Sequence, residues 1–267
     1  MSDVTFLVQG RLTKEGVDTI SKCINLGSVV LSCWDDDDPN LIDKAKNLGA
    51  KVVISNIWKN DFYNYQNVRY HIQTTLEGLR HTDTDLVIKL RGDEYYENLL
   101  PLKEKLINFP DKWIACNVFF RKDYLFHPSD HVIGMNKKDI KKTYEDSLAF
   151  INQESVINME RLDVEFLGLK PSHCFPFVTC ENLLCLNYLG TKGFCLESLR
   201  GLSDEEVVEK HRDLIIEHFK LVRVSELGRF LCRFNSNPKP NGPKFFTNEK
   251  QMIKHGGSKS ITAFDQL

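Results

Sequence analysis

The first 91 residues alternate strand-like and helix-like segments, and this alternation constrains the fold of the chain most strongly. Apolar, partly β-branched runs typical of strands occur at residues 4–8, 28–32, 51–55 and 86–90. Helical patterns with capping residues or closing glycines separate them at residues 13–27, 39–48 and 67–79. Such alternation is typical of parallel strands joined by right-handed crossovers. The sequence therefore predicts an α/β fold with a Rossmann-type, mostly parallel central sheet flanked by helices.

The pattern changes after Asp93. Further helices are expected at residues 99–109, 137–150, 179–189 and 203–219, and strands at residues 113–120 and at the end of a polar turn at 126–134. Ser203 and Glu206 form a capping-box pattern that opens the last of these helices. We expect one domain over residues 1–234, with helical additions toward its C-terminal end. An irregular tail rich in Asn, Pro, Gly and Lys is expected over residues 235–267.

The composition excludes several classes of function. Of the 267 residues, 42% are hydrophobic and 27% charged, and the formal net charge of −2 gives no general attraction to nucleic acid or anionic membrane. No apolar run approaches about 20 residues, so no transmembrane segment is expected. The first residues lack the pattern of a secretory signal, and the cysteines form no C-x-x-C pair. We expect a cytoplasmic protein; the sequence leaves its oligomeric state open.

Charged and polar residues follow directly after the apolar run at 86–90, which predicts a site there. Arg91, Gly92, Asp93 and Glu94 come where an open α/β sheet presents its ligand groups, at the carboxyl end of a strand. A carboxylate such as Asp93 can hold a hard divalent cation, because such ions prefer oxygen ligands. The alternative is a polar turn closed by charges, with no ligand.

The loops after the first two strands should meet this segment at the same edge of the sheet. Gln9 and Gly10 could then read a base, Trp34 could stack on it, and Asp35 could bind a ribose hydroxyl. For most of the acidic run at 35–38, we expect a solvated turn rather than a binding role. The residues predicted to bind the ligand in these loops are Gln9, Gly10, Arg11, Ser32, Trp34, Asp35 and Arg91.

A helix before the central strand carries Asn67, Arg69 and Gln73. Arg69 and Gln73 are four residues apart and share one face of that helix. If this face meets the site, these side chains could hold phosphate or sugar. If it meets water, they are ordinary surface groups.

Two later segments offer acid–base or ligand groups. Asp130 could be a general base and His131 a further metal ligand, although Asp130 could equally bond to nearby backbone in a turn. Glu181 lies near the predicted start of a helix, where the helix dipole favours an acid for structural reasons alone. It could also bind an acceptor hydroxyl.

Several of these motifs occur together, in order, between about residues 4 and 190. They are Gln9-Gly10, Leu31-Ser32-Cys33-Trp34, the helix with Asn67, Arg69 and Gln73, Lys89-Leu90-Arg91-Gly92-Asp93, and the turn from Phe126 to Asp130. In this combination the chain resembles the WavE-type lipopolysaccharide-synthesis glycosyltransferases. The resemblance implies a GT-A-like nucleotide-diphospho-sugar transferase, with residues 1–97 binding the nucleotide-sugar and residues 98–234 facing the acceptor. Asp93 then matches the last acid of a metal-binding D-x-D motif, and Arg91 replaces the first.

The resemblance also implies the chemistry. We expect a hexosyl- or pentosyltransferase of polysaccharide biosynthesis that uses Mn²⁺ or Mg²⁺ and moves a sugar, with UDP as the first candidate carrier, to a glycan or other hydroxyl acceptor. Asp130 is the first candidate for the catalytic base and Glu181 the second; Asp93 and His131 are the candidate metal ligands. The alternatives are a catalytically inactive sugar- or nucleotide-binding module, or a sugar nucleotidyltransferase. The latter should carry a glycine-rich basic loop, which residues 10–13 match poorly.

Overall fold

The structure is a computed structural model, and it describes residues 3–56, 68–117, 125–153 and 178–231. Asn67 and the expected tail at residues 235–267 lie outside the described residues. Among the residues described, no helix is both long enough and apolar enough to cross a membrane.

The alternation predicted for the first 91 residues is confirmed. Its elements are β1 (Val4–Gln9), α1 (Lys14–Cys23), β2 (Ser28–Trp34), α2 (Pro39–Asn47), β3 (Lys51–Ser55), α3 (Val68–Arg80) and β4 (Leu86–Arg91). Local chemistry sets the helix starts: Thr13 caps α1 by accepting from the Gly16 N–H, and Asp38 caps α2 ahead of Pro39.

The remaining elements follow the expected order, with additions. They are β5 (Tyr95–Tyr96), α4 (Leu100–Asn108), β6 (Trp113–Cys116), β7 (Val132–Asn136), α5 (Lys137–Ile151), α7 (Cys180–Thr191), η3 (Leu196–Leu199), α8 (Asp204–His218), β8 (Phe219–Val222), η4 (Val224–Leu227) and β9 (Phe230–Leu231). The capping box of Ser203 and Glu206 opens α8 as predicted. Phe219, expected in that helix, instead begins strand β8, whose register pairs it with Trp113 of β6.

The central sheet has the strand order β3-β2-β1-β4-β7-β6-β8. Strands β3, β2, β1 and β4 are parallel, β7 runs antiparallel to both β4 and β6, and β8 is parallel to β6. The mostly parallel, Rossmann-type sheet is therefore confirmed, with one inserted antiparallel strand. The short strands β5 and β9 pair with each other, outside this sheet.

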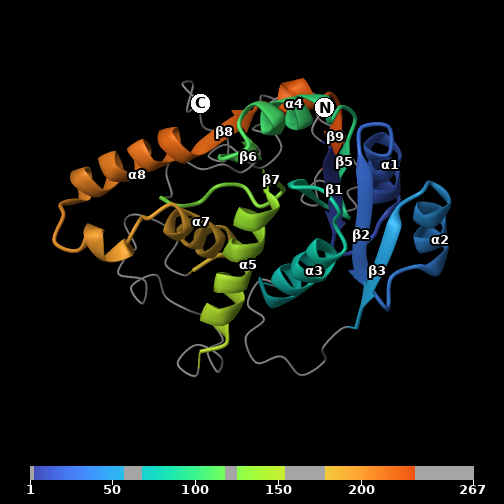
Figure 1. The fold of residues 1–267 in the computed structure, drawn as a ribbon, viewed down its shortest axis with the longest axis horizontal. Helices are drawn as coiled ribbons and strands as arrows, with labels where there is room; N and C mark the ends of the chain where they lie inside the picture. Colours follow the sequence, from blue (N-terminus) through green and yellow to red (C-terminus); the bar gives the residue numbers. More distant parts are fainter. Residues whose placement is uncertain (1–2, 57–67, 118–124, 154–177, 232–267) are drawn as a thin grey trace, which may run out of the picture.

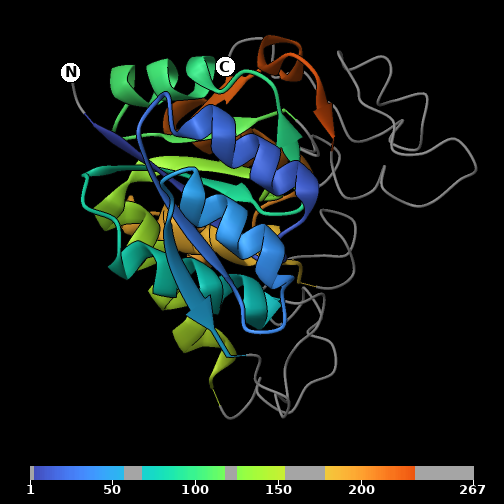
Figure 2. The same ribbon diagram turned by 90° about the vertical axis from the view of Figure 1, so that its right-hand side faces the viewer.

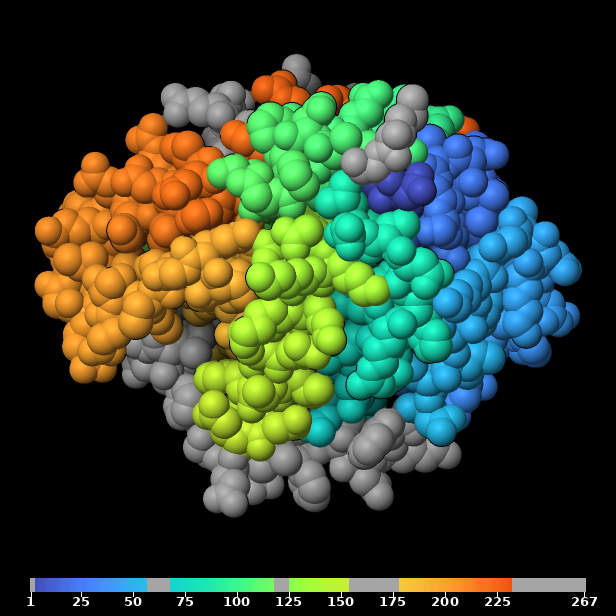
Figure 3. Space-filling view, in the orientation of Figure 1, coloured from blue at the N-terminus to red at the C-terminus, as the bar shows by residue number. Residues whose placement is uncertain are grey.

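Alternating side chains of the strands feed two apolar layers, one on each face of the sheet. Leu7, Val30 and Val87 pack with α3, α5 and α7, whereas Phe6, Leu31 and Ile88 pack with α1, α2 and α4. Figures 1 and 2 show these two sets of helices on opposite sides of the sheet. In Figure 3 the α1–α2 surface and the α8 surface lie at opposite ends of the molecule, with α3 and α5 between them.

Candidate functional site

The register of the parallel strands aligns three of the predicted site residues. Ser32 of β2 is the partner of Gln9 in β1, and Gln9 is the partner of Arg91 in β4. Side chains alternate between the two faces of a strand, so residues two or four apart lie on the same face. Ser32, Gln9 and Arg91 therefore share the α3 face of the sheet with Val30, Leu7 and Val87, respectively. The row crosses three adjacent strands at their carboxyl ends, where open α/β sheets bind ligands.

Helix α3 covers Ser32 and Gln9 in this row. Gln9 Nε2 donates to Thr74 Oγ1 at 2.6 Å, and Ser32 Oγ donates to the Thr74 carbonyl at 2.7 Å. The Trp34 ring meets the Tyr70 ring edge-on, with 5.3 Å between centroids. These predicted nucleotide-binding side chains are buried, and they also hold α3 against the sheet.

The acidic run after β2 is divided between solvent and core. Arg11 and Asp36 form an exposed pair, with Nη1–Oδ1 at 2.5 Å and Nη2–Oδ2 at 2.7 Å. Asp37 is buried, and it accepts from the Trp34 N–H at 2.9 Å and the Leu12 N–H at 3.3 Å. Asp35 is exposed beside them. Asp37 thus joins the loops after β1 and β2. The solvated turn expected for most of this run is confirmed for the exposed Asp35, Asp36 and Asp38, and Asp37 is the exception.

Gly92 has a packing role that explains its presence. A Cβ at Gly92 would lie 2.6 Å from the Arg11 carbonyl oxygen, and a Cβ at Gly16 would lie 1.9 Å from the Gly92 oxygen. The Gly92 N–H donates to the Gln9 carbonyl at 2.8 Å. The loops after β1 and β4 therefore touch backbone to backbone, and the glycine allows that approach.

Arg91 and Asp93 form a two-point ion pair at the end of β4. Arg91 Nε donates to Asp93 Oδ1 and Nη2 donates to Oδ2, both at 3.0 Å. Their side chains are 19% and 17% exposed, so the pair reaches solvent. Beneath it, Glu94 is fully buried, with Oε1 3.5 Å from Arg91 Nε. The neighbouring carboxylates, above all Glu94, raise the pKa of Arg91 despite its burial.

Glu94 joins this pair to His131, the residue just before strand β7. It bonds to Nδ1 of His131 and accepts from the Tyr96 hydroxyl at 2.6 Å. Burial alone would lower the pKa of His131, but the charge of Glu94 and the hydrogen bond to it outweigh burial, so the pKa is raised. His131 is therefore held by Glu94.

Asp130 lies in a second buried set of polar groups. Its Oδ2 is 3.1 Å from His71 Nδ1, and its carbonyl oxygen accepts from Lys89 Nζ at 2.7 Å. His71 Nε2 is 2.8 Å from the Tyr144 hydroxyl. Burial and the charge of Lys89 lower the pKa of His71 to about 4, so the neutral ring donates from Nδ1 and accepts at Nε2. Burial also lowers the pKa of Lys89 to about 8.

These partners make Asp130 a weak base. Burial alone would raise its pKa, but the hydrogen bond from His71 and the charge of Lys89 hold that pKa well below the usual range. The Asp130 side chain is also only 8% exposed. A general base is most effective when its pKa lies near the working pH. Both properties disfavour Asp130 in that role.

Glu181 is the more accessible of the two candidate bases. It lies in the first turn of α7, and its side chain is 21% exposed, with Oε2 3.9 Å from His127 Nε2. Asn182 places this helix by donating to the carbonyls of Leu125 and Phe126 at 3.1 and 3.0 Å. The turn that carries Asp130 is therefore tied to the start of α7.

Arg69 and Gln73 lie on α3, one turn apart and half-buried. Within the described part of the chain, Gln73 Oε1 is a buried acceptor with no hydrogen-bond partner. The predicted use of this helix face for phosphate or sugar stays a prediction.

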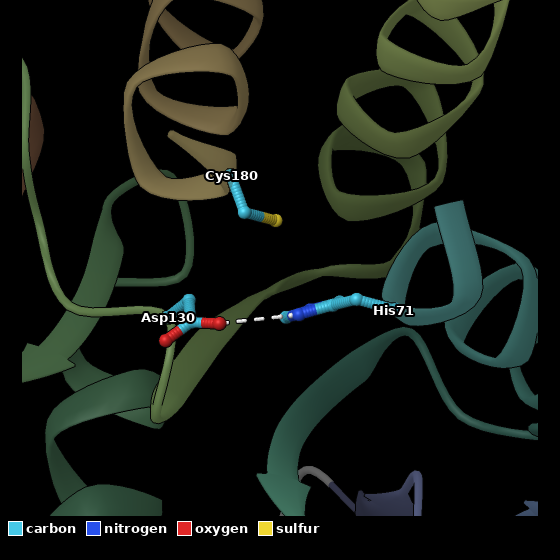
Figure 4. A group of neighbouring side chains, drawn as sticks. All are labelled: His71, Asp130 and Cys180. Carbon is cyan, nitrogen blue, oxygen red and sulfur yellow. Dashed lines mark ion pairs between the residues drawn. The ribbon is translucent and has the colours of Figure 1, made fainter. Parts of the chain in front are cut away.

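His71, Asp130 and Cys180 lie close enough together to hold a metal ion. Among the described residues they form the one set of three such side chains whose ligand atoms lie within 4.8 Å of one another. In Figure 4, His71 and Asp130 point toward each other, and the Cys180 sulfur comes from the start of α7 toward the space between them.

This set does not fit Mn²⁺ or Mg²⁺. Those ions prefer oxygen ligands, and burial raises the pKa of the Cys180 thiol, which favours its protonated form. The positive charge of Lys89 lies beside Asp130. At the predicted site, both Asp93 oxygens accept from Arg91, and His131 is bonded to Glu94. In this arrangement the predicted ligands are engaged with partners other than an ion.

Sequence reasoning assigned no role to Lys89, His71 or Tyr144. It placed Glu94 among the ligand-presenting groups after β4, whereas Glu94 is fully buried and bonded to His131 and Tyr96. A lysine between Ile88 and Leu90 in an apolar run was the available signal, because a buried lysine needs a polar partner. His71 and Tyr144 come from different helices, α3 and α5, so their contact could not be found from spacing.

No protein-family model and no curated protein matches this sequence. Among solved structures, the 4-diphosphocytidyl-2C-methyl-D-erythritol synthase of Anaerococcus prevotii is 14% identical, with a TM-score of 0.40 over 72% of this chain and 99% of that one. A Mycobacterium tuberculosis glucosyl-3-phosphoglycerate synthase, in complex with Mn²⁺, UDP and phosphoglyceric acid, is 11% identical, with a TM-score of 0.38 over 53% of this chain and 58% of that one. The glycosyltransferase GlyE of Streptococcus pneumoniae is 11% identical, with a TM-score of 0.39 over 58% and 40%. These are distant likenesses of fold, too weak to bear on activity, and the WavE-type resemblance stays a prediction.

Proposed function

We propose that the chain is a glycosyltransferase that moves a sugar from a nucleotide-diphospho-sugar to a hydroxyl group of a glycan or other acceptor. The observation that supports this most is the Arg91–Asp93 pair, partly exposed and in line with Gln9 and Ser32. Open α/β sheets bind ligands at this edge, and a guanidinium suits the two-point recognition of phosphate. An ordinary polar turn does not need a buried ionic network beneath it.

The donor is proposed to lie across the carboxyl ends of β2, β1 and β4. Its nucleoside would meet the loops after β1 and β2, and its diphosphate would meet Arg91. UDP is the first candidate carrier. The remaining proposed contacts are Gln9, Gly10, Arg11, Ser32, Trp34, Asp35, Asn67, Arg69 and Gln73.

In the transfer step the acceptor oxygen forms a bond to the anomeric carbon of the sugar. The bond from that carbon to the diphosphate breaks, and the electron pair leaves with the diphosphate. For an inverting reaction, a carboxylate takes the proton of the acceptor hydroxyl. Between the two predicted candidates, Glu181 is favoured because it is partly exposed, whereas Asp130 is buried and weakly basic.

Mn²⁺ or Mg²⁺ is the cofactor predicted from the sequence. Neither ion enters the steps above, because Asp93 is bound to Arg91 at both oxygens and His131 is bound to Glu94.

The test is turnover by the full chain with a panel of radiolabelled UDP-, GDP-, CDP- and dTDP-sugars. We expect one donor to be consumed, by transfer to an added hydroxyl acceptor or by slow hydrolysis. Saturable donor binding without turnover would indicate an inactive binding module instead. Formation of a sugar nucleotide from a sugar phosphate and a nucleoside triphosphate, with release of pyrophosphate, would indicate a nucleotidyltransferase.

A further inference from the structure

Arg91 lies between the buried ionic network and solvent. On the buried side, Arg91 Nη1 is 3.8 Å from Asp130 Oδ2, and Arg91 Nε is 3.5 Å from Glu94 Oε1. These two carboxylate side chains are 8% and 0% exposed. The Nε–Nη2 edge of the guanidinium faces Asp93, which is 17% exposed. The buried acids thus orient the guanidinium, and the partner that a ligand from solvent can reach is Asp93.

A diphosphate can replace the Asp93 carboxylate on this edge. A planar guanidinium offers carboxylate and phosphate the same pair of parallel N–H donors. The exchange substitutes one anion for another beside a fixed cation. A divalent cation at Asp93 would instead lie next to that guanidinium, where like charges repel.

We propose that the Arg91 guanidinium, rather than a divalent cation, neutralises the diphosphate of the donor, and that Asp93 occupies its outer edge until the diphosphate displaces it. This inference rests on the proposed function, which supplies the diphosphate. When the bond between sugar and diphosphate breaks, the negative charge gained by the leaving diphosphate faces Arg91. The guanidinium transfers no proton, because the carboxylates around it, above all Glu94, outweigh burial and raise the pKa of Arg91 well above its already high usual value.

Binding to the unmodified full chain tests this directly. Isothermal titration with UDP, inorganic pyrophosphate and uridine should be run in EDTA, and the UDP titration repeated in Mn²⁺. We expect UDP to bind in EDTA, with Mn²⁺ changing its affinity by less than about threefold, because the guanidinium already supplies the positive charge. UDP should bind more tightly than pyrophosphate or uridine.

The outcomes separate this inference from the proposed function. UDP binding that requires Mn²⁺ would overturn the role of Arg91 and leave the proposed function standing. Binding of pyrophosphate but of none of the four nucleoside diphosphates UDP, GDP, CDP and dTDP would overturn the assignment of the site to a nucleotide donor. If UDP, GDP, CDP and dTDP all fail to bind with and without metal while the chain is folded, both proposals are wrong.

Substitutions then assign the contact. Arg91→Met should weaken UDP binding in EDTA by about tenfold or more, as expected when a charge-assisted contact is lost, and Arg91→Lys by less. Arg80→Met is the matched control: Arg80 pairs with Glu77 on the surface of α3 and is 65% exposed, so UDP binding should be unchanged. Wild-type affinity in both Arg91 variants would overturn the inference.

Asp93→Asn distinguishes the two roles of Asp93 and keeps the size of the side chain. If Asp93 competes with the diphosphate, the variant should bind UDP in EDTA at least as tightly as the wild type. If Asp93 is a metal ligand, Mn²⁺ should increase the UDP affinity of the wild type but not that of Asp93→Asn. That result would show that the inference is wrong. This test remains available if Arg91→Met does not fold.

Discussion

The ionisable groups of the site form two regions that differ in burial and in the number of their partners. We call Arg91, Asp93 and Glu181 the rim, since their side chains are 17–21% exposed. We call the following residues the buried network: His71, Lys89, Glu94, Asp130, His131 and Tyr144. Asp93 has Arg91 as its ion-pair partner, whereas Asp130 is surrounded by His71, Lys89 and Arg91. A carboxylate with several buried partners is suited to holding structure, and one at the rim to exchanging partners.

The largest expected effect tests whether the catalytic base is a rim residue. Glu181→Gln should lower kcat for sugar transfer by ~10²–10⁴-fold if Glu181 takes the acceptor proton, with little change in donor affinity. Asp130→Asn should lower kcat less, because Asp130 is buried and weakly basic. Steady-state kinetics on both folded variants decides the matter, and the opposite ranking would make Asp130 the base.

The next effect concerns stability and the buried network. Asp130→Ala removes the carboxylate that pairs with His71 and that offsets the buried charge of Lys89, although the Asp130 carbonyl that Lys89 donates to remains. The free energy of unfolding should therefore fall by about 3–5 kcal/mol. Asp93→Ala at the rim should cost about 1 kcal/mol or less, because its pair is partly solvated. Urea denaturation of the two variants gives both values. Equal losses in the free energy of unfolding would mean that the rim and the buried network do not differ in their contribution to stability.

A pH titration tests the protonation state of the buried network. The pKa of His71 is lowered to about 4, so the unfolded chain binds a proton that the folded chain does not between about pH 6.5 and pH 4. His71 should therefore lower the free energy of unfolding as the pH falls, by up to about 1.4 kcal/mol per pH unit. The raised pKa of His131 acts in the opposite direction, because its stabilisation is present below about pH 6.5 and is lost as pH rises through the folded value.

The measurement compares wild type and His71→Gln by urea denaturation across this range. The difference between the two curves isolates His71 from His131 and from His211, whose pKa is also lowered by burial. A difference that does not change between pH 4 and 6.5 would mean that His71 is charged in the folded protein.

The smallest effect concerns the loop that leads to the rim. Gly92→Ala forces a Cβ to within 2.6 Å of the Arg11 carbonyl, so we expect a loss of about 1–3 kcal/mol in the free energy of unfolding. Gly190→Ala is the control, since a Cβ there meets nothing within 4 Å and α7 should gain about 0.5–1 kcal/mol. Thermal unfolding of both variants measures these changes. If Gly92→Ala is as stable as the wild type, the loops after β1 and β4 are not in close contact.

The parts of the fold that depend on local sequence could be predicted. The strands and helices up to β4, the cap at Thr13 and the capping box at Ser203 follow from nearby residues. Strand β8 was missed, because the sequence pattern continues as a helix up to Phe219, whereas Phe219 begins a strand that pairs with distant β6. A local sequence pattern does not reveal a partner strand that is distant in the sequence.

The sequence predicted which loops form the site, but not how their side chains contact one another. Strand order indicated that the loops after β1, β2 and β4 would meet, and the register brings Ser32, Gln9 and Arg91 into one row. The bond between Arg91 and Asp93 depends on side-chain geometry that spacing alone does not determine. The buried network depends on contacts between β4, the turn before β7, α3 and α5, which no short motif records.

A crystal structure of the full chain with UDP, grown and soaked without divalent metal, tests the central claim most directly. The account predicts the diphosphate on the Nε–Nη2 edge of Arg91, Asp93 displaced from that edge, and the uracil at the loops after β1 and β2. The buried contacts of Arg91 with Glu94 and Asp130 should remain. A diphosphate bound away from Arg91, with the Arg91–Asp93 pair intact, would contradict the account.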